Sequence, residues 1–203
     1  MATQSEFLDK ELKPLLDAAQ AGQGHVFFGD AAHFVFGTFL CHLWSFVRLF
    51  VRAASGRQRF NVLGAWNAVT HELVAVTNTT VVDTETMSEL LRKIATLGLT
   101  GPITLVLDNA RYQRNAIVQA LAKELGISLL YLPSYSPNLN LIERLWKFIK
   151  RQALYGRYHP TFADFRAAIQ EVLDKLSTTH AGPLATLMTL EFQQFENVLL
   201  MPA

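Results

Sequence analysis

The spacing of apolar residues alternates along the chain between the period of a strand and the period of a helix. Short runs of apolar and β-branched residues predict strands, and these runs cover residues 25–30, 60–68, 73–82, 103–107 and 127–132. Longer stretches with apolar residues three and four apart predict helices, and these stretches cover residues 5–19, 84–97, 114–125, 141–154 and 161–176. Paired strands followed by strand–helix units predict a mixed α/β sheet.

Glycine, polar residues and changes in composition mark the boundaries of these elements. Gly22 ends the first helix, and Thr84 is a candidate cap for the second. We divide the chain into an N-terminal helix and linker (residues 1–24), a main domain (25–176) and a C-terminal tail (177–203). The tail is rich in leucine and phenylalanine, so we expect it to form a further helix that packs on the domain or on a partner.

Three acidic residues stand at the ends of predicted elements. Asp30 ends the apolar run 25–29, and Asp108 ends the run 103–107. Glu143 lies near the start of the amphipathic helix that follows a Pro-Ser-Tyr-Ser-Pro turn. Active sites of open α/β sheets gather outside the carboxyl ends of strands, so the three carboxylates can converge. Oxygen ligands suit Mg²⁺, and a metal pair can hold both the attacking and the leaving oxygen of a phosphodiester, which predicts nucleic-acid strand chemistry.

Each acid also has a purely structural interpretation. Asp30 follows a glycine and could form a turn, and Asp108 could cap the next helix. Glu143 and Lys147 are four residues apart, which is the spacing of a surface ion pair on a helix. A ligand role is favoured because apolar runs precede both aspartates. In addition, Lys147 and Lys150 continue the helical stripe of Glu143, where they can contact phosphates beside a metal site.

Three neighbouring side chains are candidates for other roles. His33 comes three residues after Asp30 and is either a hydrogen-bonded pocket residue or a core histidine. Asn109 either orients Asp108 or a water molecule, or is a turn amide. Trp146 is expected to anchor the core rather than to stack on a base.

The net charge is only +1, but the charges are segregated along the chain. Residues 48–59 contain four arginines and no acid, and residues 111–158 contain eight basic residues and two acids. A basic face of this kind is what binding to a phosphate backbone requires, although chance clustering on a solvated surface gives the same pattern. The candidate DNA-binding residues are Arg57, Arg59, Arg111, Arg144, Lys147, Lys150 and Arg151.

The chain has 203 residues, of which 50% are hydrophobic and 17% are charged, and this is enough for one folded domain. The nearest candidate for a membrane span, residues 33–51, is interrupted by His42 and Arg48, so no span is expected. No signal peptide is recognised. The single cysteine, Cys41, excludes an internal disulfide and is expected to be a buried apolar side chain. These features predict a cytoplasmic location.

Residues 28–34, 107–110 and 135–147 resemble the DDE catalytic domain of bacterial insertion-sequence transposases, which belong to the mariner-type superfamily. The third stretch is the most specific, because a turn, Glu143 and a Trp-Lys pair recur there in fixed register. The resemblance covers residues 5–176, which is most of the chain.

The resemblance implies an α/β, ribonuclease-H-like fold: a mixed five-stranded sheet with helices on both faces. It also implies that Asp30, Asp108 and Glu143 bind two Mg²⁺ or Mn²⁺ ions. Such a domain cuts DNA at the ends of a mobile element and joins them to target DNA, as a homodimer in the active complex. Family members often place a second acid directly after the first aspartate, whereas this chain has Ala31, and this departure concerns the surroundings of the first ligand.

Family members usually carry an N-terminal helix-turn-helix region as well, and nothing in this sequence resembles it. We therefore expect the chain to bind DNA weakly and with little sequence preference. Two other functions stay open at this level. One is another ribonuclease-H-like endonuclease that uses the same metals, and the other is a non-catalytic DNA-binding or regulatory remnant of a transposase.

Overall fold

The computed structural model of the chain describes residues 4–37, 39, 46–47, 50 and 56–193. The expectation for Cys41 and those for two of the four arginines in residues 48–59 lie outside these ranges, as does the part of the tail from residue 194 onwards.

The described residues form a five-stranded sheet in the order β3-β2-β1-β4-β5. The strands are β1 (His25–Val35), β2 (Arg59–Asn67), β3 (Leu73–Asn78), β4 (Ile103–Leu107) and β5 (Ile127–Tyr131). β1 pairs antiparallel with β2 and parallel with β4; β2 and β3 are antiparallel, and β4 and β5 are parallel. The predicted mixed sheet is therefore confirmed, with β1 at its centre.

The end of β1 was predicted wrongly. Asp30 does not end its strand, because β1 continues through Val35. Parallel pairing with β4 stops at the pair Gly29↔Leu107, but the antiparallel partner β2 carries β1 onward to the pair Val35↔Arg59. Asp30 thus lies where β1 loses one neighbour and keeps the other, which leaves its side chain open toward the end of β4.

The helices are α1 (Gln4–Phe7), the π-helical turn η1 (Leu8–Leu12), α2 (Lys13–Gln20), α3 (Thr84–Ala95), α4 (Ala116–Glu124), the 3₁₀ turn η2 (Pro137–Leu139), α5 (Ile142–Ala153), α6 (Phe162–Asp174) and α7 (Ala181–Leu187). A helix is found in each of the five stretches where the apolar spacing predicts one, and further helical segments are η2 and α7. The cap of α3 is Asp83 rather than Thr84, because the Asp83 carboxylate accepts a hydrogen bond from the backbone N–H of Thr86. No helix in the described ranges is long and apolar enough to cross a membrane.

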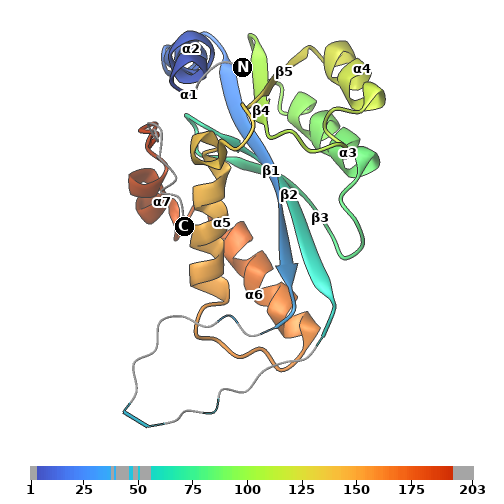
Figure 1. Cartoon of the computed structure of the whole chain (residues 1–203), viewed down its shortest axis with the longest axis vertical. Helices are drawn as coiled ribbons and strands as arrows, with labels where there is room; N and C mark the ends of the chain where they lie inside the picture. The colour runs from blue at the N-terminus through green and yellow to red at the C-terminus, as the bar shows by residue number, and fades with distance from the viewer. Residues whose placement is uncertain (1–3, 38, 40–45, 48–49, 51–55, 194–203) are drawn as a thin grey trace, which may run out of the picture.

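Helices cover both faces of the sheet, as Figure 1 shows. α3 and α4 lie on one face, where they bury a core with side chains such as Leu63, Leu91 and Leu105. α5 and α6 lie on the other face, in a core that includes Phe28, Phe34 and side chains from both ends of the described chain. The helix expected in the tail is present as α7, and its Leu184 is buried in that second core.

α5 approaches the sheet closely because β2 has no side chain at Gly64. A Cβ atom at Gly64 would lie 2.9 Å from Cη2 of Trp146 and 3.2 Å from Cδ1 of Ile142, both on α5. Gly64 is the antiparallel partner of Asp30. The missing side chain therefore lets the Trp146 ring lie on the sheet beside Asp30.

We predict that Gly64→Ala destabilises the fold by about 1–3 kcal/mol, the usual cost of overpacking a core, because the added methyl group must displace α5. Gly182→Ala is the control, since a Cβ atom there has no heavy atom within 4 Å. Urea unfolding of both variants measures the effect. Equal stability of Gly64→Ala and the wild type would contradict the close approach.

Candidate active site

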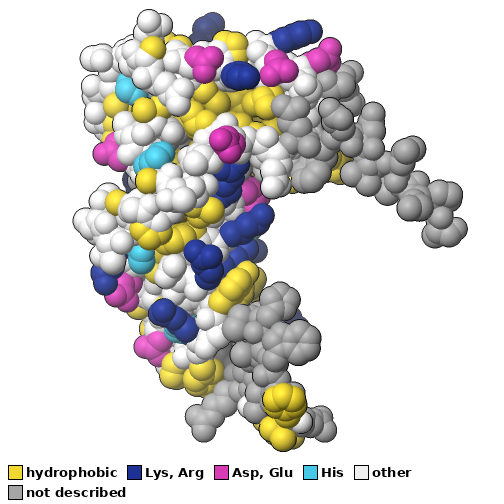
Figure 2. Space-filling model, turned by 90° about the vertical axis from the view of Figure 1, so that its left-hand side faces the viewer, with side chains coloured by type: hydrophobic (Ala, Val, Ile, Leu, Met, Phe, Trp, Pro, Cys, Tyr) yellow, Lys and Arg dark blue, Asp and Glu magenta, His cyan; other side chains and the backbone are white. Residues whose placement is uncertain are grey.

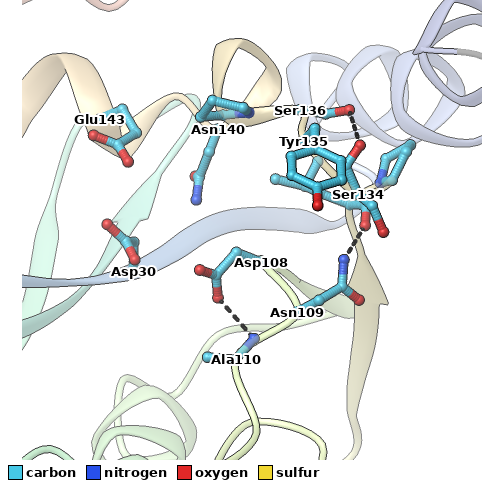
Figure 3. Close-up of a pocket in the computed structure, with 12 residues that line it drawn as sticks. Asp30, Asp108, Asn109, Ala110, Ser134, Tyr135, Ser136, Asn140 and Glu143 are labelled. Carbon is cyan, nitrogen blue, oxygen red and sulfur yellow. Dashed lines mark hydrogen bonds between the residues drawn. The ribbon is translucent and has the colours of Figure 1, made fainter.

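Asp30, Asp108 and Glu143 line one cavity of about 480 Å³. They come from three different elements: β1, the loop after β4, and the first turn of α5. Figure 3 shows Asp30 and Glu143 facing each other across the cavity, with Asp108 beside them. The structure thus brings together the three acids that the sequence pattern singles out.

The Asp30 carboxyl group is held by α5. The indole Nε1 of Trp146 donates a hydrogen bond of 2.9 Å to its Oδ2. Burial raises the pKa of the Asp30 carboxyl to about 7, and the negative charges of Glu143 and Asp108 add to the rise. The backbone N–H of Ala31 and the Trp146 indole act in the opposite direction, because both stabilise the carboxylate. The charged form of Asp30 is therefore less favourable in the folded chain than in water.

Asp108 follows β4 directly, as predicted. Its Oδ1 accepts a hydrogen bond of 3.3 Å from the backbone N–H of Ala110. The cap of the next helix is Asn115, whose side chain accepts from the N–H of Ile117. The alternative that Asp108 serves as that helix cap is thus ruled out, and its half-buried carboxylate faces the cavity.

Glu143 is half-buried in the first turn of α5. Its backbone N–H donates to the carbonyl oxygen of Asn140 at 3.2 Å. Glu143 takes part in none of the salt bridges found among the described residues. The spacing of Glu143 and Lys147 therefore does not produce the surface ion pair that was the main alternative.

Of the two supporting residues expected from the sequence, Asn109 lines the cavity and His33 does not. Asn109 lines the cavity, and its Nδ2 donates to the carbonyl oxygen of Leu132 at 2.6 Å, which ties the loop after β4 to the end of β5. His33 is an odd number of residues from Asp30, so it lies on the opposite face of β1. There its Nδ1 is 2.7 Å from Oδ1 of Asn61. His33 is not brought together with the three acids.

Two side chains at the site were not anticipated. Trp146 belongs to the core as predicted, but its hydrogen bond to Asp30 depends on a contact 116 residues away in sequence. Asn140 is 3% exposed, and its Nδ2 donates to the carbonyl oxygen of Gly29 at 3.4 Å. Its Oδ1 has no hydrogen-bond partner among the described residues. Figure 3 shows Asn140 pointing between the acids. Its place in the turn before Glu143 was the only sequence signal.

The donors at this site are carboxylate oxygens, the ligands that Mg²⁺ and Mn²⁺ prefer. Within the described residues, no group of three or more His, Cys, Asp or Glu side chains is arranged closely enough to hold a metal ion. The chemistry of the cavity nevertheless fits a cation, because the charges of Glu143 and Asp108 both raise the pKa of Asp30. A cation at Asp30 would offset this repulsion.

Lys147 of α5 lies beside Glu143. A second cavity of about 760 Å³ shares Pro137, Asn140 and Glu143 with the first and includes Lys147. Lys147 and Arg151 are exposed and Lys150 is half-buried. Figure 2 shows Lys and Arg side chains gathered along the middle of the molecular face that it presents.

Arg144 is engaged by the protein itself. Its guanidinium donates to the carbonyl oxygens of Leu187, Thr189 and Glu191 and lies 5.8 Å from the ring centroid of Phe192. Partial burial lowers the pKa of Arg144. Arg144 therefore holds the segment after α7 against α5, and this structural use was not expected for a residue placed among the DNA contacts.

The remaining predicted DNA contacts lie farther from the acids or on a loop. Arg57 and Arg59 are exposed near the start of β2, and Arg59 Nε donates to the carbonyl oxygen of Thr80. Arg59 is five residues from Gly64, which is about 17 Å along an extended strand. Arg111 is exposed on the loop that follows Asp108.

The raised pKa of Asp30 predicts how stability depends on pH. Its value is about 7 in the folded chain against an ordinary 3.8, so the folded state binds this proton more tightly. The contribution of this proton binding to the free energy of unfolding is fully present below the ordinary pKa of 3.8, and it is lost as the pH rises through about 7. In metal-free buffer, we expect Asp30→Asn to gain about 1–4 kcal/mol of stability relative to the wild type between about pH 5 and about pH 8. Urea unfolding across this range tests it, and a constant difference would contradict it.

Several solved structures share the fold of this chain. A solved structure of the Mos1 strand transfer complex matches with a TM-score of 0.60 at 14% identity, over 94% of this chain and 62% of that chain. A pre-cleavage Mos1 transpososome matches with a TM-score of 0.61 at 13% identity, over 94% of this chain and 63% of that chain. The catalytic core domain of BIV integrase matches with a TM-score of 0.50 at 16% identity, over 76% of this chain and 84% of that chain.

These similarities show a common fold, so the expected ribonuclease-H-like architecture is confirmed. The chain spans less than two thirds of the matched Mos1 chains. No curated protein matches the sequence. The model of one protein family matches residues 25–166, a span that contains all three acids, and the chain therefore belongs to the DDE superfamily endonucleases.

Proposed function

We propose that this chain is the catalytic domain of a transposase, which cleaves DNA strands and transfers them to a target in a metal-dependent reaction. The observation that carries the proposal is the shared cavity of Asp30, Asp108 and Glu143 on a fold common to transposases and integrases. The family match gives the endonuclease class. The matched Mos1 structures are a strand transfer complex and a pre-cleavage transpososome, and they support the transfer of the cut strands to a target.

Asp30, Asp108 and Glu143 would hold two Mg²⁺ or Mn²⁺ ions. When bound, such ions activate the attacking oxygen and stabilise the leaving oxygen of the phosphodiester. The chain itself orients the carboxylates: the Trp146 indole fixes one oxygen of Asp30, and the Ala110 N–H fixes one oxygen of Asp108. The hydrogen bond from Trp146 favours the charged form of Asp30.

The basic residues of α5 would hold the DNA backbone next to the acids. Lys147, Lys150 and Arg151 lie on α5 after Glu143, and Lys147 lines the cavity that adjoins the site. Contacts of this type supply salt-dependent affinity without reading sequence. Arg144 belongs in this group only if the segment after α7 moves, since backbone carbonyls occupy its guanidinium.

The substrates and the assembly are part of the proposal as well. The DNA partners are the ends of a bacterial insertion sequence and its target, and the active complex is a homodimer that works in the cytoplasm where this DNA lies. Support comes from the resemblance of residues 135–147 to insertion-sequence transposases and from the Mos1 complexes that share the fold.

We expect Asp30→Asn, Asp108→Asn and Glu143→Gln each to lower metal-dependent nicking of supercoiled DNA by at least about a hundredfold, because each change removes one charged ligand and keeps the shape of the side chain. Asp17→Asn and Glu124→Gln are matched controls, since both residues are exposed and outside the cavity. Nicking in Mn²⁺ and circular dichroism are measured for all five variants.

Wild-type nicking by any of the three cavity variants would remove that residue from the site. An assay with paired DNA ends separates a transposase from a simple nuclease, because only the former yields joined products. A wild-type chain that binds DNA but neither binds Mn²⁺ nor nicks would instead support the regulatory remnant.

Replacing Lys147, Lys150 and Arg151 together with Ala should weaken binding to any duplex and flatten the salt dependence of the affinity. Each lost phosphate contact lowers the slope of log affinity against log salt by about 0.9. The control is the triple replacement of Arg92, Lys93 and Lys123 with Ala, which removes the same charge from α3 and α4 on the other face of the sheet. Identical slopes for the two triple variants would contradict this assignment.

A further inference from the structure

The cavity has a second wall that the three acids do not form. Opposite them lies the turn Leu132–Pro137, which contributes the apolar side chains of Leu132, Pro133 and Pro137 and the ring of Tyr135. Figure 3 shows the Tyr135 ring on the side of the cavity away from Asp30 and Glu143. Such a wall does not suit a phosphate, because it offers no cation and no charged donor. It suits the flat, less polar part of a nucleotide.

Tyr135 combines an exposed side chain with an uncommon backbone conformation. Its side chain is 97% exposed, whereas Tyr155 and Tyr158 are 40% and 46% exposed. Its φ is +59°, a left-handed value that is rare for a bulky residue. Among the described residues, its ring takes part in none of the ring contacts found. Strained residues of this kind cluster at ligand-binding sites.

Several hydrogen bonds hold the backbone of the turn that carries the Tyr135 ring. Gln4 Nε2 donates to the carbonyl oxygen of Tyr135 at 3.3 Å, and Ser136 Oγ donates to that of Ser134 at 3.4 Å. Prolines at 133 and 137 restrict the backbone on both sides. Asn109 donates to Leu132 at the start of the turn.

A neighbouring cavity on the other side of the turn is lined by Arg114. A further cavity of about 320 Å³ shares Asn109, Leu132, Pro133 and Ser134 with the first. Arg114 and Glu11 line this cavity as well. The Arg114 guanidinium donates a hydrogen bond to Oδ1 of Asn109 and lies 4.6 Å from the centroid of the Tyr131 ring. A strand with one phosphate at the acids can therefore pass Tyr135 and bring a following phosphate toward Arg114.

We propose that Tyr135 and the apolar turn form a nucleobase subsite, in which the Tyr135 ring stacks on an unpaired base next to the phosphate held at Asp30, Asp108 and Glu143. The subsite rests on the proposed function, because it assigns a nucleic-acid strand to the same cavity. Stacking on a ring accepts every base, since each has an aromatic face. The ligand class is therefore an unstacked nucleotide in single-stranded or frayed DNA, recognised without base-specific hydrogen bonds.

The test compares two single-stranded oligonucleotides of about ten nucleotides, a length within the range that single-strand sites cover. One is oligo-dT, and the other has the same backbone with abasic residues. Fluorescence anisotropy in Ca²⁺, which binds oxygen ligands, gives both affinities. The variants are Tyr135→Phe, which keeps the ring, and Tyr135→Asn, because asparagine tolerates the left-handed conformation. Tyr158→Asn is the matched control, since Tyr158 is exposed and outside the cavity.

We expect the wild type, Tyr135→Phe and Tyr158→Asn to prefer oligo-dT over the abasic strand by about 5- to 100-fold, the range of one base–aromatic stack. Tyr135→Asn should lose this preference and keep its affinity for the abasic strand. An oligo-dT that carries 5-iododeoxyuridine should cross-link to Tyr135 on irradiation, and mass spectrometry identifies the residue.

A preference that survives in Tyr135→Asn would overturn the proposal, as would equal weakening of both strands or binding of neither by the wild type. A change of oligomeric state in Tyr135→Asn with no change in base preference would show that the ring packs against a second copy instead. Nicking is scored separately. If the wild type prefers oligo-dT but does not nick DNA, the subsite is supported and the proposed function is contradicted. If it nicks DNA without preferring oligo-dT, the proposed function is supported and the subsite is contradicted.

Discussion

The geometry of the site depends on the packing of α5 against the centre of the sheet. Gly64 leaves the space in which the Trp146 ring lies, and the Trp146 indole then reaches the carboxylate of Asp30. Glu143 is less than one helical turn before Trp146, so the contact that anchors α5 also fixes the distance from Glu143 to β1. The position of Glu143 relative to Asp30 therefore depends on how α5 packs on β1 and β2.

The same packing has an electrostatic cost. Burial raises the pKa of Asp30 to about 7, and two neighbouring carboxylates increase the effect. A core arranged only for stability would have a neutral or apolar side chain there, because a buried carboxylate is favourable only when it is paired or hydrogen-bonded. The hydrogen bonds from Ala31 and Trp146 offset part of this cost, and a divalent cation would offset more.

Much of the fold follows from local patterns, whereas the site needs contacts that are distant in sequence. Apolar spacing gives the order of strands and helices, and the run before Asp108 gives its position after β4. The continuation of β1 past Asp30 could not be predicted from local patterns, because it depends on pairing with β2 across a loop. The partners of Arg144 could not be predicted either: a basic residue on a helix resembles a DNA contact until backbone carbonyls from residues 187–191 are found around its guanidinium.

Residues outside the stretches that resemble transposases help to set the position of the turn before Glu143. Asn138 Nδ2 donates both to Oε1 of Gln4 and to the carbonyl oxygen of Gln193, and thereby joins the two ends of the described chain at this turn. Gln4 also holds the carbonyl oxygen of Tyr135. The turn connects β5 to α5 and carries Asn140 and Tyr135 into the cavity. Two segments that form no part of the sheet therefore hold the wall opposite the acids in place.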